Sequence, residues 1–503
     1  MKTIIDTIKS LFLIMLPLLI ISCEDFLDIE DENAVTSEAV LQTEEGVISA
    51  LNGVYASLQD QGLYGAHIEV IGDAAADNTV FPSDREGSGS NFDRLPHAYN
   101  LELDDVNTAS FTWEDAYVVI NNINSILTSV EGIPIAEGLK DRVIGECLAL
   151  RALMHFELVK IFSQDYNTAI SDPDNLLGVP YITIVDATAQ PSRNTMTEVF
   201  DNIFNDINTA IPLIQNNDAP DGRSGSNEQF FLNYYGALGI RAKVNFYITD
   251  YSEAIKDVNI IINGPYSLSS YEISSITLDG SGLPELDLIQ TWSQREIIPE
   301  ESIFMLDISS DDGVFANRSL IDIYTNYGGN AAHGISDDLY NLYEATDIRR
   351  NWYQVEPPSV SGSGVDLHVF KYPGTFGFDE DDHSFPIMRL SEFILMKAEI
   401  EARNGNEEVA RNFVNQITTR ANASVITSTG NQLIEDIITE RRKEMAFEGN
   451  RLFDLKRLQR SVTRTDCTLP SNCTVNAKDR LFAWPIPQDE FNGNPNMKQN
   501  PGF

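Results

Sequence analysis

The feature that most constrains the fold is a set of apolar stripes with the period of an α-helix. In four segments apolar side chains recur every three or four positions, so each segment would bury one face when helical. The stripes comprise Leu150, Leu153, Met154, Leu158, Ile161 and Phe162; Phe231, Tyr234, Tyr235, Leu238 and Ala242; Leu390, Phe393, Ile394, Ala398 and Ala402; and Ile434, Ile437, Ile438 and Met445. Further helices are predicted near 42–59, 113–130, 196–214, 252–263 and 406–422, and strands only at 302–308 and 367–372. The sequence therefore predicts a mainly α fold with few short strands.

Small residues recur at a fixed spacing in two of these segments. Ala242 and Ala254 are twelve residues apart, and so are Ala398 and Ala410. Small residues on both arms of a helix-turn-helix allow the helices to cross closely, and the spacing is similar to that of tetratricopeptide repeats. Two helical hairpins are therefore expected here.

Long loops rich in Gly, Ser and Asp separate the predicted helices. They lie near 73–108, 264–300, 309–336 and 354–386. Loops of this length in a compact domain usually carry function or are disordered. Their many aromatic residues argue against disorder, because disordered segments are poor in aromatics.

The first 22 residues have the pattern of a secretory signal peptide. Lys2 and Lys9 precede an apolar run, residues 11–21, that is too short to span a bilayer. The run ends in Ser22-Cys23, which resembles the lipobox of bacterial lipoproteins and implies that Cys23 becomes the acylated N-terminus. A plain signal peptide with a chance cysteine is the alternative. Residues 23–34 are acidic and resemble the surface-export tether of Bacteroidetes lipoproteins.

The other three cysteines divide into a loop pair and a single residue. Cys467 and Cys473 lie in the polar stretch TDCTLPSNCT and are candidates for a small disulfide in an oxidising envelope. A metal site is less favoured, because no histidine or further cysteine lies nearby. Cys147 falls in a helical pattern and is predicted to be a buried free thiol. No metal and no cofactor are expected.

The overall charge limits the possible partners. With 76 acidic and 34 basic residues the chain has a net charge of -42. Nucleic acid binding needs a basic surface, as does docking on anionic lipid, so neither partner is expected.

One segment, ERRKEMAFEGNRLFDLKR at 440–457, departs from this acidic average. On a helix Glu440, Glu444 and Glu448 would stack in a column, and such a column needs flanking cations such as Arg441 and Arg451. Apolar residues interleave with these charges, which predicts a semi-buried, ion-paired scaffold, with a break between two helices at Gly449. Acid–base catalysis by the carboxylates is the less favoured alternative, because no nucleophile or metal ligand accompanies them.

Several motifs together resemble the SusD/RagB family of Bacteroidetes outer-membrane nutrient-binding lipoproteins. They run in the family's order and comprise LALRALMHFELVKIF (148–162), YEATDIRRN (343–351), FPIMRLSEFILMKAEIEARNGN (385–406), the charged segment, and a terminal Pro485-Ile486-Pro487…Asn494-Pro495…Gln499-Asn500-Pro501-Gly502 pattern. The resemblance implies about four tetratricopeptide-like hairpins in one domain, 35–503, with a loop-rich ligand-binding insertion at about 264–386. It also implies a cell-surface lipoprotein of the outer membrane that passes oligosaccharides to a SusC-like TonB-dependent transporter.

Carbohydrate recognition needs aromatic faces and side chains that hydrogen-bond in pairs, and the predicted loops contain both. Trp292 is the strongest single candidate, whereas Trp352 fits a buried ring equally well. Trp113 and Trp484 are expected in the core. The complete candidate set is Asp73, Asn78, Phe81, Arg85, Trp292, Arg295, Tyr324, Tyr327, Trp352 and Tyr353.

Three functions remain open from the sequence. The favoured one is non-catalytic binding of a glycan. A surface glycoside hydrolase needs two carboxylates across a cleft, which an acidic chain can supply, although the common hydrolase and metalloenzyme motifs are absent. A module that binds peptides or other nutrients is the third, since tetratricopeptide repeats often bind peptides. Calcium binding by the run at 379–382 is less favoured than a solvated charge run.

Overall fold

A computed structural model describes residues 40–80, 108–172, 177–220, 223, 225–277, 285–289, 298–308, 320–324, 333–355, 367–372, 383–464 and 473–503. The predicted signal peptide, tether and lipidation site at Cys23 lie outside these residues. So do the acidic run at 379–382 and the candidates Phe81, Arg85, Trp292, Arg295, Tyr327 and Cys467.

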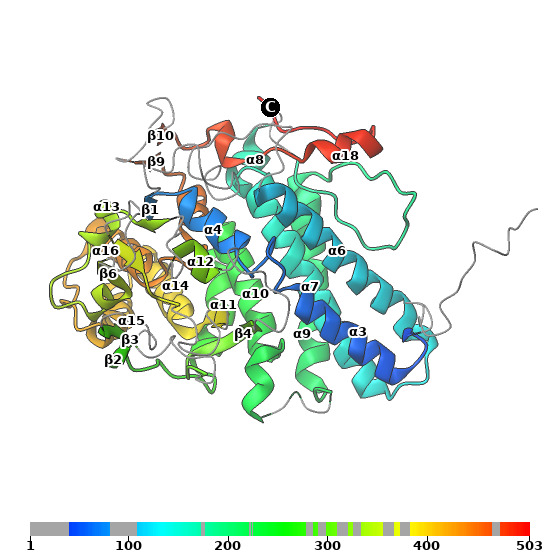
Figure 1. The fold of residues 1–503 in the computed structure, drawn as a ribbon, viewed down its shortest axis with the longest axis horizontal. Coiled ribbons are helices and arrows are strands. Elements are labelled where there is room, and N and C mark those ends of the chain that lie inside the picture. The colour runs from blue at the N-terminus through cyan, green and yellow to red at the C-terminus, as the bar shows by residue number, and fades with distance from the viewer. Residues whose placement is uncertain are drawn as a thin grey trace, which may run out of the picture.

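Helices dominate the described residues, as predicted (Figure 1). The first half contains α3 (Glu44–Ser57), α4 (His67–Ala74), α6 (Thr108–Ser129), η3 (Val130–Gly132), α7 (Glu137–Phe162), α8 (Tyr166–Ser171), α9 (Met196–Asn216) and η5 (Gly225–Phe230). The second half contains α10 (Tyr234–Tyr247), α11 (Tyr251–Ile262), α12 (Leu320–Tyr324), α13 (Asp337–Tyr340), η8 (Ile348–Trp352), α14 (Leu390–Arg403), α15 (Glu407–Arg420), α16 (Gly430–Glu444), α17 (Arg451–Arg457), η10 (Arg480–Phe482) and α18 (Gln488–Gly493).

The long helix α7 forms the centre of the helical scaffold. Its side chains are buried on nearly all sides from Arg142 to Phe162, because α6, α9 and α10 all pack against it. The neighbouring helix α9 begins at a capping box, in which Thr195 Oγ1 accepts from the Glu198 amide and Glu198 Oε2 accepts from the Thr195 amide. Burial on nearly all sides therefore fixes the position of α7, and the capping box fixes the residue at which α9 begins.

The two predicted hairpins are confirmed. Helices α10 and α11 pack together, as do α14 and α15. Ala242, Ala254, Ala398 and Ala410 have no exposed surface, as expected for residues at close helix crossings. Helices α6 and α7 form a further packed pair. The assignment of these pairs to the tetratricopeptide class stays a prediction.

The strands form five two-stranded antiparallel ribbons within the described residues. They pair β1 (Thr79–Val80) with β5 (Gly334–Ile335), β2 (Ile273–Thr277) with β3 (Glu285–Ile289), β4 (Ser302–Ile308) with β8 (His383–Arg389), β6 (Tyr353–Val355) with β7 (Leu367–Val369), and β9 (Val462–Thr463) with β10 (Thr474–Val475). The strand predicted at 302–308 is confirmed, and the one predicted at 367–372 is shorter. No sheet of the described chain is wide enough to organise the fold, so the helices provide the scaffold.

One continuous hydrophobic core joins the N-terminal and C-terminal parts of the chain. It includes Val47 of α3 and Ile486 near the C-terminus. Trp113 and Trp484 belong to it, as predicted, with 3% and 0% of their surface exposed. The C-terminal segment crosses the top of Figure 1 and is held in part by Trp113 Nε1, which donates to Glu490 Oε1 over 2.8 Å. Within the described residues, no helix has both the length and the apolar character needed to cross a membrane.

Where the structure describes a cysteine, its state agrees with the prediction from the sequence. Cys147 is a buried free thiol, as predicted. Cys473 is in a disulfide. It directly precedes β10, and its carbonyl accepts from the amide of Arg464, the residue directly after β9, at 2.8 Å. Because Cys467 lies outside the described residues, its pairing with Cys473 stays a prediction.

Candidate ligand-binding site

A buried ionic network lies at the C-terminal end of α16, with Glu444 at its centre. Glu444 Oε2 accepts from Arg349 Nη1 at 2.9 Å, and its Oε1 accepts from Arg389 Nη1 at 2.7 Å and Arg420 Nη2 at 2.5 Å. The side chains of Arg349, Arg389 and Glu444 have no exposed surface. The guanidinium groups hold the pKa of Glu444 well below its usual range, although burial alone would raise it. This carboxylate is therefore a permanent anion in the interior.

Segments far apart in the sequence converge on this network. Arg349 is fixed by Asp347, which accepts from its Nε at 2.9 Å and from its Nη2 at 2.8 Å. Arg389, at the end of β8, also donates to Glu448 Oε2 at 2.8 Å. Lys371 binds Glu448 too, and its ammonium lies 4.4 Å from the ring centre of Trp352. The sequence motifs at 343–351 and 385–406 thus share a structural purpose, which is to supply cations to the acidic end of α16.

Two arginines that the sequence placed beside the acidic column bind other carboxylates. Arg441 does not bind Glu444; its Nε donates to Asp454 at 2.8 Å and its Nη2 to Glu392 at 3.1 Å. Arg451 does not bind Glu448; it forms two hydrogen bonds of 2.7 and 2.8 Å with Asp77.

The physical reason is the end of α16 at Glu444. Beyond it the chain leaves the helix, with φ of 62° at Phe447 and 67° at Gly449, so Glu448 does not continue the helical column. The predicted break at Gly449 is confirmed, as is the prediction of an ion-paired scaffold, whose central side chains are fully buried and not semi-buried.

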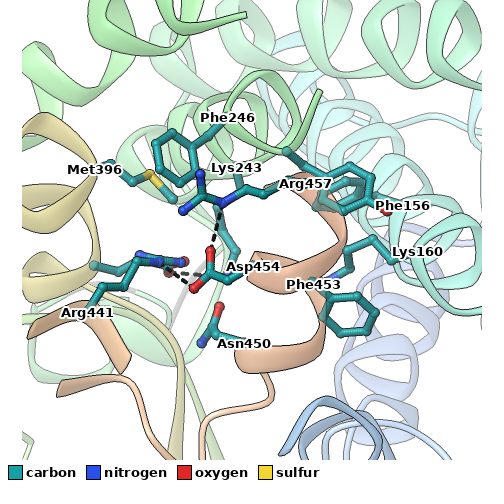
Figure 2. A pocket seen from close by; sticks show the side chains of 12 residues that line it. Phe156, Lys160, Lys243, Phe246, Met396, Arg441, Asn450, Phe453, Asp454 and Arg457 are labelled. Carbon is teal, nitrogen blue, oxygen red and sulfur yellow. Dashed lines mark hydrogen bonds and ion pairs between the residues drawn. The ribbon is translucent and has the colours of Figure 1, made fainter. Parts of the chain in front are cut away.

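A small cavity in this ionic core is too small for a nutrient (Figure 2). Asp454 lies between Arg441 and Arg457, and Arg457 also donates to Glu399 at 2.8 and 2.9 Å. Figure 2 shows the aromatic rings of Phe246 and Phe453 on either side of these charges. The cavity holds about 30 Å³, whereas ligand pockets are typically about 300–1,000 Å³. These charges stabilise the fold and do not form a ligand site.

Two polar candidates from the sequence are part of the same interior. Asp73 is fully buried and accepts from Asn78 Nδ2 at 2.6 Å and from the Gly449 amide at 2.8 Å. Burial raises the pKa of Asp73 to about 6, and the two hydrogen bonds oppose that rise. Asn78 in turn accepts from Arg442 Nε at 2.9 Å. The position of both side chains under β1 fits a structural role and not direct contact with a ligand.

Three aromatic candidates also face inward. Tyr324, Trp352 and Tyr353 are exposed by 2%, 0% and 3% of their surface. Tyr324 packs edge-on against Phe447 with ring centres 5.1 Å apart, and Trp352 packs on Tyr271 at 5.5 Å. Their rings fill the space between the ribbons and the end of α16. The sequence offered all three as ligand-binding rings, with a buried position weighed equally for Trp352, because the short elements that carry them have no clear periodicity.

The remaining candidates belong to segments whose attachment points are described. Val80 pairs with Gly334, so the chain that continues to Phe81 and Arg85 leaves the β1–β5 ribbon at the same end at which the chain after Tyr327 returns. Ile289 pairs with Ile273 at the end of β3, just before Trp292 and Arg295. In Figure 1 these ribbons lie on the left, beside α13, α15 and α16. We call this side of the molecule the loop face.

The loop face also contains an aromatic residue that sequence reasoning missed. Tyr340 ends α13, directly after the β1–β5 ribbon, and its ring is only partly buried. The Arg350 guanidinium lies 4.3 Å from its ring centre, and Arg350 Nη2 donates to the Tyr340 hydroxyl at 2.7 Å. Ser336 caps α13 and is itself held by the Asn78 carbonyl at 2.9 Å. The Ser-Asp-Asp stretch before Tyr340 is a helix-start signal that would have located this ring.

Metal ligands do not cluster in the described part of the chain: no group of three or more His, Cys, Asp or Glu side chains there has the geometry to hold an ion. The acidic side chains of the network are bound to arginine and lysine.

Comparison with known proteins identifies the relatives of this fold. A sequence model of the SusD family matches residues 364–503, and one described as "starch-binding associating with outer membrane" matches residues 25–223. The chain is 22% identical to SusD-like protein P38 of Formosa agariphila over 98% of both chains. It is 23% identical to the starch-binding protein SusD of Bacteroides thetaiotaomicron over 76% of both.

A solved structure of a SusD superfamily protein from Bacteroides thetaiotaomicron superposes with a TM-score of 0.78 and 25% identity. The match covers 91% of this chain and 100% of that one. Three of the motifs that resemble SusD/RagB proteins, those at 343–351, 385–406 and 440–457, supply side chains to the buried ionic network. The chain belongs to the SusD/RagB family.

Proposed function

We propose that this protein binds an oligosaccharide at the cell surface without altering it and delivers it to a SusC-like TonB-dependent transporter of the outer membrane. After removal of residues 1–22, an acyl chain on Cys23 and the acidic tether 23–34 would hold it on the outer leaflet. The names of its relatives, which state starch binding and association with the outer membrane, support this role.

The observation that carries the proposal is the arrangement of the loop face. The segments that contain Phe81, Trp292 and Tyr327 start or end at short ribbons, and β1 is tied to the ionic network through Asn78 and Arg442. Rigid attachment lowers the conformational entropy that a loop loses when a ligand binds. Tyr340 and Arg350 add an aromatic face and a guanidinium beside one of these attachment points, which suits a sugar ring and its hydroxyl groups.

The carboxylates at the centre of the ionic network are not suited to hydrolysis. A glycoside hydrolase needs one carboxylic acid that is protonated near neutral pH and a second carboxylate across an open cleft. Glu444 and Glu448 are buried, and arginine and lysine lower the pKa of both. They therefore cannot donate a proton to a leaving group at neutral pH.

The test is calorimetric titration of the mature protein with a panel of neutral and uronic oligosaccharides, beginning with maltoheptaose, and chromatography of each mixture. One or more glycans should bind and be recovered intact. Trp292→Ala and Tyr340→Ala should each weaken binding, whereas Tyr166→Ala, a partly buried tyrosine on α8, serves as the matched control. Shortened products would establish a hydrolase. Binding of peptides and of no glycan would establish a module that binds peptides or other nutrients.

The membrane arrangement has its own test. Cys23→Ser should release the protein from the outer-membrane fraction, and mass spectrometry of the native N-terminus should find an acylated Cys23. Affinity purification from the native membrane should recover a TonB-dependent transporter with the wild-type protein. An unmodified N-terminus, or purification without such a transporter, would contradict this part of the proposal.

A further inference from the structure

A polar groove on the helical scaffold lies apart from the loop face. Helix α10 forms its floor and packs against α9 on one side and α11 on the other. The groove has a volume of about 320 Å³ and is lined by Phe204 and Asn208 of α9, Arg241 and Asn245 of α10, and Asp250, Glu253, Lys256 and Asp257 at the start of α11. This volume lies at the lower end of the range for ligand pockets. We propose that this groove, the scaffold groove, is a second binding site for a neutral sugar unit; the inference rests on the proposed function.

Asn245 is the residue that points to a ligand. Only 5% of its surface is exposed, and its side chain lines the groove. Its side-chain amide has two donors and an acceptor and makes no hydrogen bond to another residue that the structure describes, whereas its backbone carbonyl accepts from the Asp250 amide at 2.9 Å. The nitrogen and oxygen of this amide are not enclosed by protein, so they open into the groove, where water or a ligand satisfies them. A ligand with adjacent hydroxyl groups would do so.

The floor of the groove also presents oriented donors. Asp257 holds Arg241 bidentately, at 2.8 Å to Nε and 2.7 Å to Nη2, and Asn208 Oδ1 accepts from Nη1 at 2.7 Å. These contacts use three of the five N–H groups of the guanidinium and leave two, one on each terminal nitrogen. Because the carboxylate fixes the plane of the guanidinium, the remaining donors lose little entropy when they bind a ligand. The amide nitrogen of Asn208 adds further donors on the wall of the groove.

Acceptors lie on the opposite wall. Asp250 caps α11 with one oxygen, which accepts from the Glu253 amide at 3.2 Å, and its second oxygen has no hydrogen-bond partner within the described part of the chain. The three carboxylates and two cations of the groove are largely paired with one another, as Arg241–Asp257 and Lys256–Glu253. A strongly charged ligand would meet a repelling neighbour on either wall. A hydroxyl group both donates and accepts, so a neutral polyhydroxyl ligand fits this mixture of groups.

Phe204 supplies the apolar part of the site. Its ring lines the groove and is only partly buried, so one face is available to the C–H side of a sugar ring. Ring, guanidinium and unpaired amide together form a minimal sugar-binding arrangement. A glycan bound at the loop face could bind here as well, or a second chain could bind here independently; either would raise retention of the glycan at the cell surface.

The test uses a background in which the loop face is disabled by Trp292→Ala and Tyr340→Ala. Saturation-transfer difference NMR with the glycans that bind the wild-type protein should still detect binding to this background. Asn245→Leu, which keeps the side-chain volume, should weaken that residual binding by about tenfold. Phe204→Leu should weaken it too, and provides a second variant if Asn245→Leu does not fold. The matched control is Asn205→Leu, an exposed asparagine of α9 outside the groove.

Each outcome decides the question. Loss of residual binding in Asn245→Leu but not in Asn205→Leu supports the scaffold groove as a second site. Equal residual binding in both variants, or none in the loop-face background while the wild-type protein binds, would overturn the inference and leave the proposed function standing. Failure of the wild-type protein to bind any glycan of the panel would instead remove the proposed function, and this inference with it.

Discussion

Arg389 Nη1 lies 2.7 Å from Glu444 Oε1, and neither side chain has any exposed surface. Two further cations, Arg349 and Arg420, contact the same carboxylate. A buried anion with three cationic partners cannot be exchanged for a neutral group without leaving the buried network short of one negative charge. The interior of this family member therefore depends on charge as much as on apolar packing.

Replacing Glu444 by glutamine should strongly destabilise the protein. The substitution keeps the shape but leaves three buried guanidinium groups short of an anion, and breaking such a network costs about 3–5 kcal/mol. The measurement is urea unfolding followed by circular dichroism. Glu435→Gln is the matched control, because Glu435 pairs with Arg460 at the surface, where the two side chains are 49% and 36% exposed. That change should cost less than about 1 kcal/mol. Equal midpoints for the two variants would contradict the central role of Glu444.

His155 should make the protein sensitive to acid. Its ring is fully buried and stacks on Tyr181 with centroids 3.7 Å apart. Its Nδ1–H donates to the Arg151 carbonyl at 2.9 Å, and its Nε2 accepts from the Ile182 amide at 3.1 Å, so the neutral ring is satisfied at both nitrogens. Burial lowers its pKa to about 3.

Between pH 6.5 and 3 the unfolded chain binds a proton at this histidine and the folded chain does not. The contribution of His155 to the free energy of unfolding is therefore fully present above pH 6.5. It decreases as the pH falls, by about 2 kcal/mol at pH 5. In His155→Gln the difference in unfolding free energy from wild type should shrink by that amount between pH 7 and pH 5. Parallel stability curves for the two proteins would show that folding does not lower the pKa of His155.

The helices could be predicted from the sequence because the signals that specify a helix lie within a few residues of one another. A stripe of apolar residues, a pair such as Ala242 and Ala254, and a glycine at a helix end each act within a few residues of chain. Gly449 illustrates this, since a break between two helices was predicted there from the residue type, and the structure gives it a positive φ.

The ionic partners and the buried rings could not be predicted, because they depend on tertiary contacts. Glu444 finds Arg349 and Arg389 across 95 and 55 residues of chain, and nearby arginines such as Arg441 were the obvious but wrong partners. Trp352 lies in a five-residue 3-10 helix, too short for a stripe to show which face is buried. The same limit applies to Asn245, whose place in a groove depends on how three helices pack.

Thiol counting should test the predicted disulfide. Cys147 is buried and its thiol pKa is raised by burial, so it should not react in the native protein. If Cys467 pairs with Cys473, the folded mature protein should expose no reactive thiol, and the denatured, unreduced protein should expose one. Reduction should then add two. Three thiols before reduction would exclude any disulfide, and peptide mapping would identify the bonded pair.

Alanine substitutions at Gly72 and Gly53 form a matched pair that tests how closely α4 packs against the turn at Gly449. A Cβ on Gly72 would lie 2.0 Å from the Gly449 carbonyl oxygen, in the turn that leads to α17, whereas a Cβ on Gly53 in α3 would meet nothing within 4 Å. Both changes restrict the unfolded chain in the same way. Gly53→Ala should therefore stabilise the protein by about 1 kcal/mol, and Gly72→Ala should destabilise it by about 3 kcal/mol through overpacking.

The same pair connects the scaffold to binding. Helix α4 leads through Asn78 into β1, where the segment with Phe81 begins, so displacement of α4 by Gly72→Ala should move this attachment point. Glycan affinity should then fall in Gly72→Ala under conditions where the variant is still folded, and remain unchanged in Gly53→Ala; thermal unfolding and calorimetric titration of both variants give the two quantities. If Gly72→Ala lost stability but kept full affinity, the loop face would not depend on the seating of α4. Its geometry would then have to come from the β1–β5 ribbon and the Ser336 cap alone.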